Sequence, residues 1–98
     1  MSNKNEIIEF LKKELTSIEC VKESHIIGSF VESENYNDVD LIILFKHQND
    51  LIFIIEKIKS IKEKFKNVHR KSLHVSSFTF RESQYFEQFK SSNSLINL

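Results

Sequence analysis

The chain has 98 residues, enough for one domain with a single core, and a domain of this size buries only about two-thirds of its unfolded surface. Its 14 basic and 14 acidic residues cancel, so no net positive field attracts a nucleic acid, and such a partner is disfavoured. One cysteine excludes an internal disulfide framework, and no apolar run reaches the ~20 residues of a membrane span. Because the N-terminus also lacks a signal-peptide pattern, we expect a cytoplasmic protein with one domain over residues 1–98 and no membrane partner.

The first third of the chain predicts a helix followed by a strand. Asn3 and Glu6 have the spacing of a helix cap, and apolar residues follow at helical intervals at Ile7, Leu11, Leu15 and Ile18. Residues 21–27 then predict a strand that ends at the only glycine of the molecule. The segment 30–37 predicts a short helical turn that ends as a loop.

The rest of the chain alternates between strands and helices. Residues 41–45 are apolar on both faces, which is typical of a central strand. Asp50 is a plausible N-cap for a long helix, in which apolar residues recur at helical spacing from Leu51 to Phe65.

Residues 67–72 predict a basic connection and 73–78 a third strand. Thr79 and Glu82 have capping-box spacing before a short helix with Phe86 and Phe89 on its apolar edge. The tail 91–98 has no usable periodicity. Periodicity alone therefore predicts an α/β domain.

Two carboxylates begin the central strand. Side chains of a strand repeat with period 2, so Asp38 and Asp40 project from one face while Val39 and Leu41 project from the other. Neighbouring carboxylates repel each other unless a cation lies between them. The pair therefore predicts a site for a hard divalent metal with oxygen ligands, although Asp-x-Asp at a strand start also occurs as turn chemistry.

The position of Gly28 also needs a reason, because the chain has no proline and makes its other turns without glycine. A Gly-Ser turn after a strand lets backbone N–H groups and a hydroxyl approach a ligand closely, and phosphate is the obvious candidate. Ser29 has an alternative role as a simple helix cap.

Together, Gly28-Ser29 and Asp38-Val39-Asp40 with the apolar run after them resemble the signature of the nucleotidyltransferase superfamily that includes DNA polymerase β. The length is similar to the minimal nucleotidyltransferases (MNT type), which often pair with a helical HEPN-type protein. The resemblance extends to the order of elements along roughly the whole chain. It implies a small mixed β-sheet with helices on one face and the metal site on the other.

The resemblance also implies a chemistry. Asp38 and Asp40 would be catalytic and would hold Mg²⁺ or Mn²⁺, while Gly28 and Ser29 would hold the phosphates of ATP or another nucleoside triphosphate. A nucleoside monophosphate, with AMP the first choice, would pass to a hydroxyl of a partner protein, as in the antitoxin of a HEPN/MNT toxin–antitoxin pair. The alternative is a catalytically degenerate module that keeps the fold and acts by binding its partner.

The sequence departs from the family pattern in two places. The later strand lacks the acidic residue that relatives carry, and His74 occupies about that position as a third catalytic candidate, a base or weak ligand. Glu32 stands where relatives often have arginine, so either Glu32 or Glu34 supplies a missing ligand or both are solvated, as loop glutamates usually are.

The small size of the chain leaves little surface with which to enclose an acceptor. We therefore expect a helical HEPN-type protein, or a second copy of the chain, to dock over the metal face near residues 30–37 and 67–72. Arg70 and Lys71 would supply the positive charge of that contact.

Overall fold

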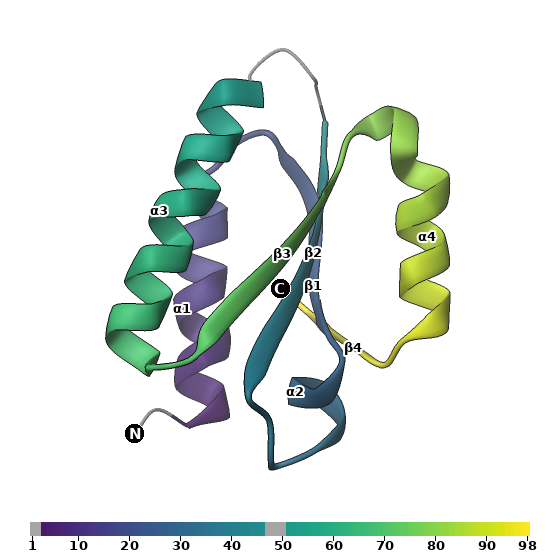
Figure 1. Cartoon of the computed structure of the whole chain (residues 1–98). Coiled ribbons are helices and arrows are strands. Elements are labelled where there is room, and N and C mark those ends of the chain that lie inside the picture. The colour runs from purple at the N-terminus through teal and green to yellow at the C-terminus, as the bar shows by residue number, and fades with distance from the viewer. Residues whose placement is uncertain (1–2, 47–50) are drawn as a thin grey trace.

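The computed structural model describes residues 3–46 and 51–98 and contains a four-stranded mixed sheet with the strand order β3-β2-β1-β4 (Figure 1). Strand β1 pairs antiparallel with β2 and β4, and β2 pairs parallel with β3. The predicted α/β class is confirmed. In chain order the elements are α1 (Lys4–Thr16), β1 (Val21–Ile27), α2 (Ser29–Glu32), β2 (Asp38–Phe45), α3 (Leu51–His69), β3 (Ser72–Phe78), the 3-10 turn η1 (Phe80–Glu82), α4 (Ser83–Ser92) and β4 (Leu95–Asn97).

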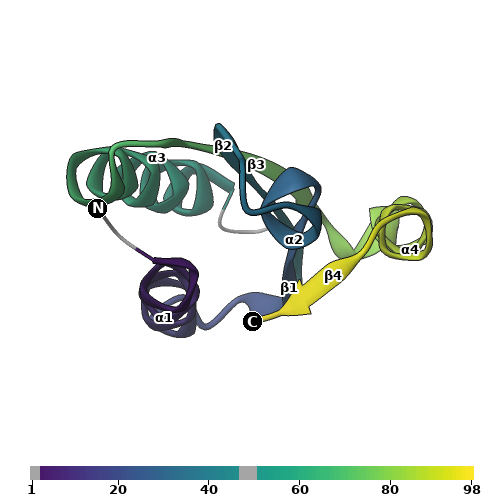
Figure 2. The same cartoon turned by 90° about the horizontal axis from the view of Figure 1, so that it is seen from below.

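Helices α1 and α3 lie side by side on one face of the sheet (Figure 2). The α1 helix begins where the Asn3 side chain accepts a hydrogen bond of 2.8 Å from the backbone N–H of Glu6. The predicted apolar stripe is buried in one core with alternate residues of β2. That core contains Ile7, Leu11, Leu15, Ile54, Ile61, Phe65, Val39, Leu41, Ile43 and Phe45.

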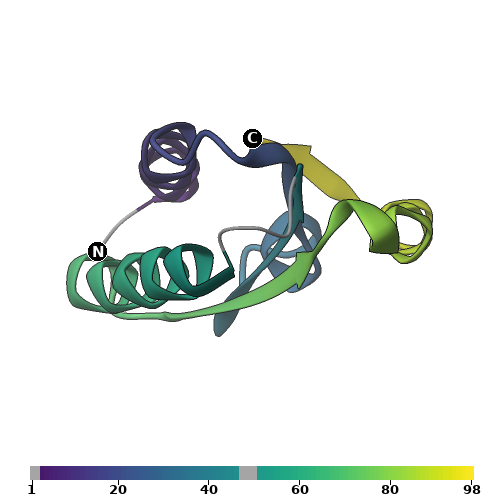
Figure 3. The same cartoon turned by 90° about the horizontal axis from the view of Figure 1, so that it is seen from above.

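Helix α4 lies on the opposite face, so helices cover both faces of the sheet rather than one (Figures 2 and 3). Its buried Phe86 packs in a second cluster with Ile27, Ile42 and Leu44. The capping box of Thr79 and Glu82 is present ahead of this helix. Figure 1 shows that β2 begins beyond the end of α4, and we call this end of the α4 face the open end.

Two parts of the chain differ from the sequence expectation. Helix α3 continues through His69, because that residue is buried against the core, so residues 67–69 are helical rather than a loop. The tail contains β4, which pairs with only three residues of β1, too short a segment for periodicity to show. The Asp50 cap lies outside the described residues.

Within residues 3–46 and 51–98, no helix has both the length and the apolar character that crossing a membrane requires.

Candidate functional site

The carboxylates of β2 lie at the open end of the α4 face. Val39 and Leu41 are buried beneath α1 and α3, whereas Ile42 points to the α4 side. Because side chains of a strand alternate, Asp38 and Asp40 share the α4 side with Ile42. The Asp40 side chain is 42% exposed, so its carboxylate is held by the sheet and remains accessible to a ligand.

The turn at Gly28 lies directly against Asp40. Gly28 has φ 81° and ψ −151°, a conformation that residues with a side chain rarely adopt. A Cβ atom at this position would lie 2.9 Å from Asp40 Oδ2. Strand pairing causes this approach, because Ile27 is the partner of Asp40 across the antiparallel ladder. The two halves of the sequence motif therefore meet in space.

Ser29 is the first residue of α2 and is exposed. Gly28 occupies the N-cap position, and its carbonyl accepts the backbone N–H groups of Val31 and Glu32. Ser29 therefore lies inside the helix rather than at its cap.

His74 lies beside Asp40 on the neighbouring strand. The two residues are partners in the parallel β2–β3 ladder, and His74 Nδ1 lies 3.5 Å from Asp40 Oδ1. The His74 side chain is 60% exposed. The structure thus brings three of the predicted residues, Gly28, Asp40 and His74, into one place.

The glutamates of the segment after Gly28 face solvent. Both Glu32 and Glu34 are exposed, and the Glu34 side chain, 93% exposed, forms an ion pair of 3.9 Å with Lys4. Across the described part of the chain, no three His, Cys, Asp or Glu residues are grouped so that they could hold a metal ion. A pair of carboxylates still suits Mg²⁺, which commonly binds to one or two carboxylates and completes its shell with water and substrate phosphates.

Sequence reasoning missed the contacts that fix the segment before Asp38. Lys4 Nζ donates hydrogen bonds to the backbone carbonyls of Phe30, at 2.6 Å, and Ser33, at 2.7 Å. Lys71 Nζ donates to the Tyr36 carbonyl at 3.1 Å and lies 4.7 Å from the centre of its ring. Burial, helped by the nearby Glu34, raises the pKa of Tyr36. The paired residues are 26 to 35 positions apart in the sequence, so no local sequence pattern predicts these contacts.

These contacts correct the expected docking region. Phe30 is fully buried in the core, so it is not available to a partner. The Lys71 amine is engaged within the chain. Arg70 is exposed at the end of α3.

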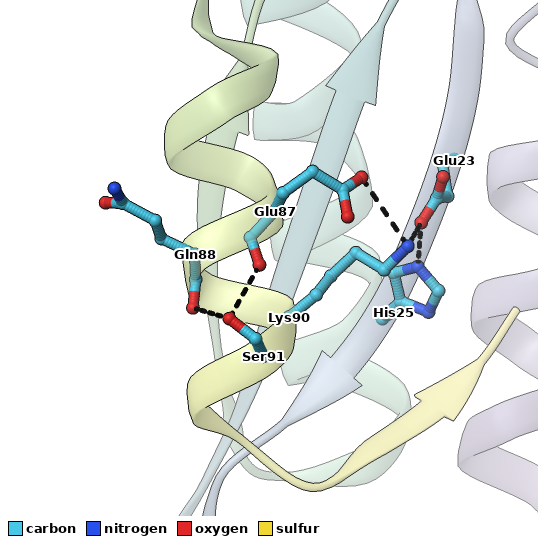
Figure 4. Close-up of polar contacts among 6 residues, drawn as sticks. All are labelled: Glu23, His25, Glu87, Gln88, Lys90 and Ser91. Carbon is cyan, nitrogen blue, oxygen red and sulfur yellow. Dashed lines mark hydrogen bonds and ion pairs between the residues drawn. The ribbon is translucent and has the colours of Figure 1, made fainter.

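A polar cluster anchors α4 to β1 on the same face (Figure 4). Glu23 Oε2 lies 2.5 Å from both His25 Nε2 and Lys90 Nζ. Burial would raise the pKa of Glu23, but the hydrogen bonds from Lys90 and His25 outweigh it and lower that pKa. The hydrogen bond to Glu23 in turn raises the pKa of Lys90. The centre of the His25 ring lies 5.9 Å from the centre of the Phe86 ring, so this cluster also holds α4 against β1.

The fold is similar to several solved structures. Two are crystal structures of mutant forms of the toxin–antitoxin pair MntA–HpeT. The first has 17% identity and a TM-score of 0.57, covering 98% of this chain and 72% of that chain. The second, in which two aspartates spaced two residues apart are replaced by glutamate, has 16% identity and a TM-score of 0.55, covering 96% and 72%.

A third similar structure, at 14% identity and a TM-score of 0.51, is a protein from Sulfolobus solfataricus described as a candidate nucleotidyltransferase; the match covers 96% of this chain and 77% of that one. No family model matches the sequence, and no curated protein matches it significantly. The structural likeness extends over nearly the whole chain, and it establishes the nucleotidyltransferase fold.

Proposed function

We propose that this chain is a metal-dependent nucleotidyltransferase that transfers AMP from ATP to a hydroxyl group of a partner protein. The observation that carries the proposal is the meeting of Gly28, Asp40 and His74 at the open end of the sheet. Gly28 has a φ of 81°, which residues with a side chain rarely adopt, and strained backbone positions of this kind cluster at ligand-binding sites.

Asp38 and Asp40 are the residues that would hold Mg²⁺ or Mn²⁺. When bound there, the ion neutralises charge on the triphosphate and favours departure of pyrophosphate. The absent Cβ of Gly28 leaves Asp40 Oδ2 uncrowded, which suits a carboxylate that must accept a cation. The backbone N–H and hydroxyl of Ser29 would bind the β- and γ-phosphates.

In the transfer, a bond forms between the acceptor oxygen and the α-phosphorus, and the bond from that phosphorus to the pyrophosphate oxygen breaks. The acceptor proton must leave as this happens. In this proposal the exposed His74 ring, whose Nδ1 lies 3.5 Å from Asp40 Oδ1, accepts that proton.

The proposed setting is a toxin–antitoxin pair, with this chain as the antitoxin and a helical HEPN-type protein as its acceptor. The likeness to MntA–HpeT structures supports this setting. The aspartates substituted in the second of them have the same spacing as Asp38 and Asp40. A second copy of the chain is the alternative partner.

The test measures transfer of label from ATP carrying ³²P at the α-phosphate to the product of the neighbouring gene. We expect Asp40→Asn to abolish incorporation, and His74→Ala to reduce it by about 10² to 10⁴-fold. Glu34→Gln is the matched control, since it removes an exposed acidic charge outside the site. Unchanged incorporation with Asp40→Asn would overturn the proposal.

The second candidate function is a non-catalytic module that regulates its partner by binding. It is favoured because no three His, Cys, Asp or Glu residues of the described chain are grouped as metal ligands, whereas the resembled family commonly carries a third carboxylate. A stable complex with the neighbouring gene product, formed equally by wild type and Asp40→Asn without any incorporation of label, would support it.

A further inference from the structure

Strand β3 forms an open edge of the sheet. Among the described residues, β3 pairs only with β2, along seven consecutive residues from Ser72 to Phe78. In any such strand, alternate backbone N–H and C=O groups point away from the sheet. An edge of this length can pair with another extended chain, and proteins usually shorten or cover such edges.

Helix α3 runs beside β3 (Figures 2 and 3). Residues of these two elements line two adjoining hollows. One has a volume of about 340 Å³ and is lined by residues that include Lys66, Ser72 and His74. The other has a volume of about 430 Å³ and is lined by residues that include Ile55 and Ser77. Lys62 and Glu63 line both hollows, so together they form one trough, which we call the β3 groove.

The β3 groove is positively charged although the whole chain is neutral. Lys59, Lys62 and Lys66 line it, and Glu63 is the one acidic residue among the lining residues. All four side chains are exposed. A local excess of positive charge attracts an acidic partner.

The groove also offers apolar surface. Ile55 is 58% exposed and Ile58 is half-buried at the end of the groove near Ser77. An exposed isoleucine beside a free strand edge provides a place for an apolar side chain of a paired segment.

His74 connects the β3 groove with the candidate site, which lies on the α4 face of the sheet. His74 lines the groove, and its Nδ1 atom lies 3.5 Å from Asp40 Oδ1. A segment paired with β3 opposite His74 would therefore place a side chain next to His74, two strand positions away from Asp40.

We infer that the β3 groove binds the acceptor as an extended acidic segment of a partner protein, which pairs with the free edge of β3 and presents its hydroxyl residue beside His74. This inference rests on the proposed function for the role of the hydroxyl. The binding itself requires no catalysis. The phosphates of a nucleic acid could also pair with the lysines of the groove. A nucleic acid lacks the regularly spaced N–H and C=O groups with which a strand edge forms hydrogen bonds, so the observations favour a polypeptide.

The probe is a fluorescein-labelled heptapeptide of alternating glutamate and tyrosine, with binding followed by fluorescence anisotropy without metal or ATP. We expect Lys62→Glu/Lys66→Glu to weaken binding at least about fivefold. Lys13→Glu/Lys22→Glu is the matched control, because it makes the same change of charge at two exposed positions away from the groove, on α1 and β1. This control should bind the peptide nearly as wild type does.

Main-chain pairing is tested with two further peptides, methylated on alternate backbone nitrogens in one frame or in the other. Only one frame of a strand faces β3, so one peptide should bind and the other should not. Equal binding of both, or tighter binding of a single-stranded oligonucleotide with the same charge, overturns the inference. If the Asp40→Asn variant binds the peptide normally but wild type transfers no nucleotide, the groove stands and the proposed enzyme function fails.

Discussion

Gly28 and Asp40 are 12 positions apart in the sequence, yet a Cβ atom on Gly28 would lie only 2.9 Å from Asp40 Oδ2. The antiparallel pairing of β1 with β2 sets this proximity, because it places Ile27 opposite Asp40. The glycine therefore serves two purposes. It allows the turn at φ 81°, and it leaves room for the carboxylate.

Gly28→Ala should lower the free energy of unfolding by about 1–3 kcal/mol, because the new side chain is strained by the backbone and crowds Asp40. Urea denaturation of the metal-free protein measures the change. Ser29→Ala is the control and should have a much smaller effect, since Ser29 is exposed. A fully stable Gly28→Ala protein would show that the turn does not require glycine.

Mg²⁺ or Mn²⁺ together with ATP should raise the melting temperature of the wild-type protein. A ligand that binds only the native state adds RT ln(1 + [L]/Kd) to its stability. Asp38→Asn should lose this response, and in EDTA it should melt above wild type because one of two neighbouring negative charges is gone. A melting series in which neither metal nor nucleotide changes the wild-type transition would contradict the metal site.

Arg70→Gly should raise the free energy of unfolding by about 0.5–1 kcal/mol. Arg70 ends α3 with φ 58°, the left-handed conformation in which glycine is preferred, and its N–H donates to the Lys66 carbonyl at 3.0 Å. The side chain is exposed, so its removal loses little packing. Chemical denaturation measures the gain.

Arg70→Ala separates the backbone effect from the loss of charge. Alanine keeps a Cβ in the left-handed region, so this variant should show no comparable gain. Equal stabilisation by alanine and glycine would mean that removal of the positive charge, rather than relief of the backbone, is responsible.

The parts of the fold that sequence reasoning predicted are those with a local signal. The apolar stripe of α1 and the apolar run of β2 depend on the spacing of neighbouring residues, and both are buried as expected. Strand β4 gave no such signal, because three residues cannot show a period and their position is decided by pairing with β1.

In the candidate site, too, features with a local sequence signal could be predicted, and features that depend on distant segments could not. The shared face of Asp38 and Asp40 could be predicted from the sequence, because side chains two positions apart in a strand point to the same side. The engagement of Lys4 with Phe30 and of Lys71 with Tyr36 depends on how distant segments pack, so it could not be predicted. The placement of α4 beside the site, rather than with α1 and α3, depends in the same way on the contacts of Phe86.

The stability of the protein should fall as the pH drops below 6.5, and His69 should account for part of the loss. His69 is 6% exposed, and its two ring nitrogens have no hydrogen-bond partner among residues 3–46 and 51–98. The rings of Phe10 and Phe65 lie about 5 Å away. Burial lowers the pKa of His69 below its ordinary value of 6.5, although the negative charge of Glu6 opposes the shift.

The sign of the effect follows from where protons bind. Between the ordinary and the lowered pKa, the unfolded chain binds a proton at His69 that the folded chain does not, so acid favours unfolding. The contribution of His69 is fully present above pH 6.5 and declines as the pH falls through that window. His69→Leu, which keeps an apolar side chain in the core and cannot titrate, should therefore show a shallower dependence on pH.

Urea denaturation of wild type and His69→Leu between pH 8 and pH 5 measures this difference. The comparison uses the change in unfolding free energy with pH for each protein, so a constant packing cost of the leucine cancels. Parallel profiles for wild type and His69→Leu would mean that the buried ring accepts its proton in the folded protein as readily as in the unfolded chain.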